Sequence, residues 1–135
     1  MKRIISLFLL ISVVSCETSD NSLFNNIRIQ GEWEVVEINE IPAPEGEVIR
    51  ITFNEDGFGG STATNSYSGS YSLKRDEILF EGVFSTLVVE FPYGVSFFGL
   101  IVSANNRTAL NVYFTEEDTM VLSAPDSRYM VLKRQ

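Results

Sequence analysis

The side chains in this sequence that could perform chemistry are hydroxyls, carboxylates and a single thiol. The 135 residues include no histidine and one cysteine, Cys16, so the commonest general base and the commonest zinc ligand are missing. Most carboxylates fall in turn sequences, where charged residues face water. Asn54-Glu55-Asp56-Gly57 lacks the spaced oxygen ligands of a calcium loop and is typical of a hairpin turn. We therefore expect no catalytic residues, no metal, no cofactor and no enzymatic activity.

The N-terminal segment has the composition of an export signal. Lys2 and Arg3 precede an apolar run from Ile4 to Val14, which is shorter than the roughly 20 residues of a transmembrane helix. The segment ends in Val13-Val14-Ser15-Cys16, which resembles the lipobox of bacterial lipoproteins. That resemblance implies cleavage before Cys16, a thioether to diacylglycerol and N-acylation, with palmitate among the expected acyl groups. The alternatives are a free cysteine beside an ordinary signal and a buried cysteine in an N-terminal helix.

Processing at Cys16 would divide the chain into a signal peptide over residues 1–15, a polar tether over 16–27 and a β domain over 28–135. The net charge of −8 would become −10, because Lys2 and Arg3 are lost with no acidic residue. An acidic domain is unsuited to nucleic acid and to anionic lipid head groups. We therefore expect the lipid anchor alone to hold the protein at the bacterial cell envelope. The outer membrane is favoured, and the periplasmic or surface face is left open.

The rest of the sequence consists mainly of short alternating apolar and polar runs between turn residues, typical of an antiparallel sandwich or barrel. Val35-Val36 breaks the alternation of the first run and predicts a β-bulge. The run from Phe84 to Val89 is interpreted as an apolar strand. Helical spacing predicts one helix from about Tyr93 to Asn105, with Ser96 as its N-cap.

The segment Asn65-Ser66-Tyr67-Ser68-Gly69-Ser70-Tyr71 has the pattern N-x-Y-x-G-x-Y, which resembles the centre of the META/HslJ domain family. Gly31-Glu32-Trp33 matches the G-x-W that opens the family, and Ser85-Thr86 falls where the family has Ser-Thr after a strand. The similarity covers about residues 28–134. The family often has a cysteine pair, which is absent because Ala63-Thr64 and Val88-Val89-Glu90 occupy those places.

This resemblance implies a mainly β fold, an antiparallel, open β-barrel-like meander of about eight or nine short strands with one helix packed against it. Family members are often envelope lipoproteins or stress-associated proteins, so a binding, structural or stress-related role is expected. The motif residues with an expected structural or binding role are Trp33, Asn65, Tyr67, Gly69, Tyr71 and Thr86.

The aromatic residues permit two interpretations. They fill the interior of a small barrel, or they line a pocket for a small apolar ligand, as in a lipocalin-like carrier whose sequence also opens with G-x-W. We favour core filling, in which case the binding partner would be an envelope protein rather than a small apolar ligand. We also expect the rings of Tyr67 and Tyr71 to cover Gly69. The residues concerned are Trp33, Phe53, Tyr67, Tyr71, Phe80, Phe84, Phe91, Phe97 and Phe98.

Overall fold

The computed structural model describes residues 27–135. The predicted signal peptide, Cys16 and all but the last residue of the predicted tether lie outside the described residues. The described part contains a helical turn at residues 27–29, nine strands and one longer helix. In chain order the elements are β1 Gly31–Ile38, β2 Ile41–Pro42, β3 Arg50–Phe53, β4 Phe58–Ser61, β5 Ser66–Lys74, β6 Glu77–Ser85, α2 Pro92–Ile101, β7 Arg107–Glu116, β8 Thr119–Ser123 and β9 Tyr129–Arg134.

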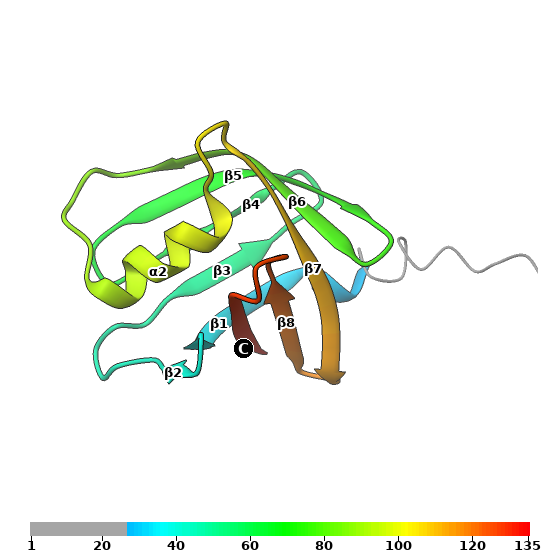
Figure 1. Cartoon of the computed structure of the whole chain (residues 1–135), viewed down its shortest axis with the longest axis horizontal. Coiled ribbons are helices and arrows are strands. Elements are labelled where there is room, and N and C mark those ends of the chain that lie inside the picture. The colour runs from blue at the N-terminus through cyan, green and yellow to red at the C-terminus, as the bar shows by residue number, and fades with distance from the viewer. Residues whose placement is uncertain (1–26) are drawn as a thin grey trace, which may run out of the picture.

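The strands form one antiparallel sheet that closes into a barrel (Figure 1). From β3 to β9 each strand pairs with the next along the chain, while β3 and β9 both pair with β1. The two-residue β2 adds to the far end of β1, at Glu37 and Ile38. The predicted mainly β, antiparallel meander with one helix is confirmed. The ring is closed by the β1–β9 pairing rather than open, which removes the free edges of an open sheet.

The predicted bulge in β1 is confirmed. Val35 pairs with Leu132 of β9 and Glu37 with Val131, so one extra β1 residue lies between these two pairs. The extra residue shifts the alternation and turns both Val35 and Ile38 into the interior.

Aromatic rings fill the interior of the barrel. The Phe80 ring packs edge-on against Phe58, with centroids 5.0 Å apart, and Phe53 packs edge-on against Tyr71 at 5.1 Å. These rings occupy the space that a carrier would use for an apolar ligand, which favours the core-filling interpretation. That interpretation is wrong for Phe84 and Phe91, because both side chains are exposed.

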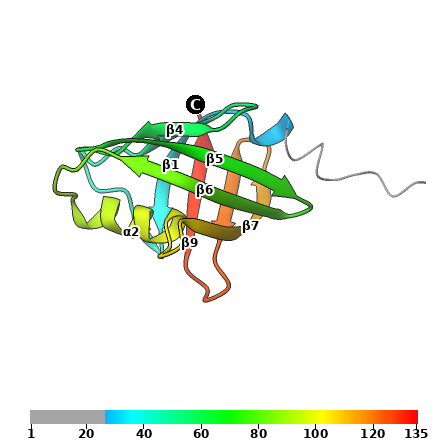
Figure 2. The ribbon, with the colours of Figure 1, turned by 90° about the horizontal axis from the view of Figure 1, so that it is seen from above.

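The helix α2 packs across one end of the barrel (Figures 1 and 2). Its buried face includes Phe97, whose ring lies 5.2 Å from that of Tyr67 on β5. The helix begins at Pro92, a residue suited to the first turn, and its N-cap is Phe91 rather than the predicted Ser96. It ends at Ile101, before the predicted end at Asn105, because Val102 is already extended. Within residues 27–135, no helix is long and apolar enough to cross a membrane.

Candidate functional site

The centre of the N-x-Y-x-G-x-Y motif is a buried side-chain amide at the helix end of the barrel. The Asn65 carbonyl oxygen accepts hydrogen bonds from the Thr86 hydroxyl at 2.8 Å and from the Val88 backbone N–H at 2.9 Å. The Asn65 amide nitrogen donates to the Val88 carbonyl at 2.8 Å. A single side chain therefore fixes the segment that follows β6, where the sheet provides no further strand.

The same amide group holds a carboxylate. Asn65 Nδ2 donates to Glu90 Oε2 at 2.6 Å, and the hydroxyls of Thr62 and Thr64 donate to the two Glu90 oxygens at 2.8 and 3.0 Å. Gly94 gives this side chain room, since a Cβ there would lie within 2.5 Å of three Glu90 side-chain atoms. Glu90 thus lies against the first turn of α2, where a negative charge is favourable. Three hydrogen bonds bind the carboxylate, which is an anchoring arrangement rather than a reactive one.

Tyr67 and Gly69 have roles in packing. The Tyr67 hydroxyl donates to the Arg50 carbonyl at 2.5 Å, and burial raises the pKa of this tyrosine. The ring that a Cβ at Gly69 would meet is that of Phe58, at 2.9 Å. The prediction that Tyr67 and Tyr71 cover Gly69 is therefore wrong. Phe58, on the neighbouring β4, is paired directly with Gly69 and supplies the cover.

Tyr71 and Trp33 lie apart from the Asn65 cluster. The Tyr71 hydroxyl donates to the Asn54 carbonyl at 2.6 Å, and the Trp33 indole N–H donates to the Ile29 carbonyl at 2.7 Å. The Arg134 guanidinium stacks on the Trp33 ring, 4.3 Å from its centroid. The structure therefore brings Asn65 and Thr86 together, while Trp33, Tyr67, Gly69 and Tyr71 stabilise separate parts of the barrel.

The end of β6 and the residues that connect it to α2 expose large apolar side chains, which we call the apolar segment. Leu87 is 98% exposed, Val89 89% and Phe84 74%, and the side chains of Val88 and Phe91 are also exposed. Isolated apolar residues are common on protein surfaces, but five exposed large apolar side chains within residues 84–91 make this region a candidate contact surface.

The sequence predicts a strand from Phe84 to Val89, which is confirmed only for Phe84 and Ser85, and the structure explains the difference. β6 ends at Ser85, and its pairing with β7 stops at Glu81. Beyond that point the Val83 N–H is bound by the Asn106 side chain instead of by a strand. Because β-branched residues suit both buried strands and exposed contact surfaces, their composition alone did not distinguish the two. The sequence did not indicate the Glu90 anchor, because its partners Thr62, Thr64 and Asn65 lie more than 20 residues earlier in the chain.

A groove of about 320 Å³ opens beside the apolar segment, between Asn65, Phe98 and the residues from Ser85 to Glu90. Among residues 27–135 no group of three or more carboxylates is close enough to hold a metal ion.

Comparisons with known proteins agree with the motif. The model of the META domain matches residues 25–89. An NMR structure of a protein from Burkholderia xenovorans is similar over 90% of this chain and 93% of that chain, with 14% identity and a TM-score of 0.60, which shows the shared fold. A crystal structure of an uncharacterized protein from Bacteroides eggerthii covers 78% of this chain and 98% of its own, with 20% identity and a TM-score of 0.47. No curated protein matches the chain. The match over residues 25–89, which contains Trp33, Asn65 and Thr86, shows that the chain belongs to the META-domain family.

Proposed function

We propose that this protein is a lipid-anchored component of the bacterial cell envelope whose META domain is a non-catalytic binding module. The apolar segment carries the binding part of this proposal. The lipobox-like sequence before Cys16 supports the anchor. The filled interior of the barrel disfavours the alternative of a lipocalin-like carrier.

The position of the apolar segment favours a protein as its partner. The described chain begins at residue 27 at one end of the barrel, and the segment between β6 and α2 lies at the opposite end in both views (Figures 1 and 2). A module tethered through its N-terminal end would present this segment away from the membrane. The run from Val83 to Val89 has no charged residue, while the whole chain carries a net charge of −8. The partner that fits is an envelope protein with an apolar contact surface and a basic surround.

The anchor can be tested by intact mass and by metabolic labelling with an alkyne fatty acid in a Gram-negative host. We expect the full chain to be cleaved before Cys16 and to carry the label, and Cys16→Ala to remain an unlabelled precursor. Recovery of an unlabelled, cleaved wild-type protein in the soluble fraction would contradict anchoring.

The binding surface can be tested in intact cells with a photo-crosslinking amino acid at position 87. Position 74, the exposed last residue of β5 next to the β5–β6 turn at the other end of the barrel, is the matched control. We expect a discrete crosslinked protein from position 87 only, which disappears when Phe84 and Val89 are both replaced by serine. Equal products from positions 74 and 87, crosslinks to lipid, or products between two copies of the chain would each overturn the proposed partner.

A further inference from the structure

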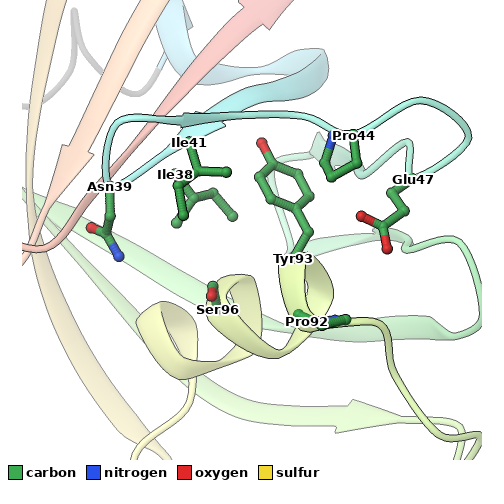
Figure 3. Close-up of a pocket in the computed structure, with 8 residues that line it drawn as sticks. All are labelled: Ile38, Asn39, Ile41, Pro44, Glu47, Pro92, Tyr93 and Ser96. Atoms are coloured by element: carbon green, nitrogen blue, oxygen red, sulfur yellow. The ribbon is translucent and has the colours of Figure 1, made fainter.

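A second concave site lies at the same end of the barrel, beneath β2 and the loop that follows it (Figure 3). Its volume is about 260 Å³. The end of β1, the β2 loop and the first turns of α2 provide its lining residues, which are Ile38, Asn39, Ile41, Pro44, Glu47, Pro92, Tyr93 and Ser96. None of these residues belongs to the apolar segment, so this site is independent of the proposed function.

The walls of the pocket are mainly apolar and are held in place. The Tyr93 ring stands between Ile38 and Ile41 on one side and Pro44 and Glu47 on the other (Figure 3). Its hydroxyl donates to the Val35 carbonyl at 3.3 Å, which ties the helix to β1. The loop after β2 is also held to β1, because the Ala43 N–H donates to the Val36 carbonyl at 2.9 Å. A pocket with fixed walls loses little conformational entropy on binding.

The electrostatic character of the pocket is negative. Glu47 is the one charged residue in the lining, and no basic side chain is among the lining residues. Glu37 and Glu34 on β1 are near enough to act on the same tyrosine. Burial raises the pKa of Tyr93, and the charges of Glu37, Glu34 and Glu47 raise it further. An anion is therefore disfavoured in this pocket and a cation is favoured.

The volume limits the occupant to a small group. Sites for drug-sized ligands usually measure about 300–1,000 Å³, so this pocket suits a single side-chain-sized moiety. A short alkyl chain matches the isoleucine and proline walls, and a terminal positive charge matches Glu47.

We propose that the pocket beneath β2 binds a primary alkylammonium group of about the length of a lysine side chain. The alkyl chain lies against Ile38, Ile41 and the Tyr93 ring, and the ammonium group lies next to Glu47. The ligand is either a free alkylamine or a lysine side chain of a peptide, and both present the same chemistry to the pocket.

The experiment uses n-pentylammonium as the probe and the full-length chain in nanodiscs of zwitterionic lipid, with empty nanodiscs as the blank. Methyl-labelled isoleucine reports the site by NMR, because Ile38 and Ile41 line the pocket while Ile78 is buried in β6. We expect saturable shifts at Ile38 and Ile41 and none at Ile78. Binding should weaken as salt is added. Pentanoate and 1-pentanol test the need for charge, and a peptide with a single lysine, compared with its norleucine counterpart, distinguishes a side-chain source from a free amine.

Matched variants test the role of the carboxylate. Glu47→Gln should weaken n-pentylammonium binding about three- to fivefold, as expected for a partly exposed ion pair. Glu55→Gln makes the same charge change in the exposed β3–β4 turn and should leave the affinity unchanged. The proposal is overturned if n-pentylammonium produces no saturable shift, if pentanoate or 1-pentanol binds equally well, or if the two variants lose affinity equally.

Discussion

The side chain of Asn65 forms, with the backbone of Val88, the pair of hydrogen bonds that a neighbouring strand would otherwise supply. Its carbonyl oxygen accepts from the Val88 N–H at 2.9 Å, and its amide nitrogen donates to the Val88 carbonyl at 2.8 Å. One polar side chain therefore extends the order of the sheet into a segment with no strand beside it. This arrangement explains how Leu87 and Val89 stay exposed on a fixed backbone.

Replacement of Asn65 by alanine should destabilise the protein and release the apolar segment. The change removes bonds to Thr86, Val88 and Glu90 and leaves buried polar groups unpaired, at a cost of about 2–4 kcal/mol. Urea unfolding measures the loss, and hydrogen exchange at the Val88 amide measures the release. Asn111→Ala, at an exposed position of β7, is the control and should change stability by less than about 0.5 kcal/mol. Equal losses in the two variants would contradict the proposed role of Asn65.

Gly60→Ala and Gly99→Ala should have opposite effects. A Cβ at Gly60 would lie 1.9 Å from the Arg50 carbonyl oxygen and 2.8 Å from the Tyr67 hydroxyl, so strand β4 must move away from β3. We expect a loss of about 2–3 kcal/mol. Gly99 lies on the exposed side of α2, and its Cβ would meet only one arginine nitrogen, at 3.8 Å. Alanine there should add about 0.5–1 kcal/mol through helix propensity. Thermal unfolding of both variants checks the two signs.

Stability should fall at high pH because of Tyr67. Burial raises the pKa of this tyrosine above its ordinary value of 10.0. The unfolded chain therefore ionises first, and the folded state binds more protons than the unfolded state above about pH 10. The stabilisation of the folded state by protonated Tyr67 is fully present below about pH 10. Above that pH it declines by up to about 1.4 kcal/mol per pH unit.

Tyr67→Phe separates this effect from ordinary packing. The variant should be less stable near neutral pH by about 1 kcal/mol, because the hydrogen bond to the Arg50 carbonyl is lost. It should also lose less stability than the wild type between about pH 9 and pH 11, since one ionising group is gone. Urea midpoints across this range provide the measurement. An unchanged pH slope would show that Tyr67 does not contribute to it.

Phe97→Ala should show that α2 is part of the core. Phe97 is fully buried and lies against Tyr67, so its truncation should cost about 3–5 kcal/mol. Val95 lies on the exposed side of the same helix, and Val95→Ala should change stability by less than about 0.5 kcal/mol. Urea unfolding of the two variants compares the two sides of one helix. Similar small losses in both would mean that the helix is only loosely docked.

The local periodicity of the sequence predicted most elements of the barrel. The bulge at Val35-Val36 was predictable because an interrupted alternation has few other causes in a strand with one buried side. The closure of the ring was not, since it depends on the register between β1 and β9, which lie at opposite ends of the domain sequence. The end of α2 was also missed, because helical spacing continued after Val102 although the backbone there is extended.

The candidate site was predictable in part. The family motif identified Asn65 and Thr86, which do lie together, because a polar motif between strands indicates specific hydrogen bonding. It did not identify Glu90, whose partners Thr62 and Thr64 become neighbours only when α2 folds back onto the barrel. The exposure of Leu87 and Val89 could not be predicted, because a short apolar run in the sequence has the same pattern whether it is a buried strand or an exposed segment.

The pairing of β1 with β9 also determines when the protein can finish folding. Arg134 donates to the Gln30 carbonyl at 2.8 Å, a contact between positions 104 residues apart. Closing so long a loop is entropically costly, and folds rich in such distant contacts reach the native state slowly. During synthesis, β1 and β8 present unpaired edges until β9 has been made, and such edges promote aggregation. A chain truncated before Tyr129 should therefore be retained by chaperones or degraded, while a full-length chain should become protease-resistant only after its last strand is released.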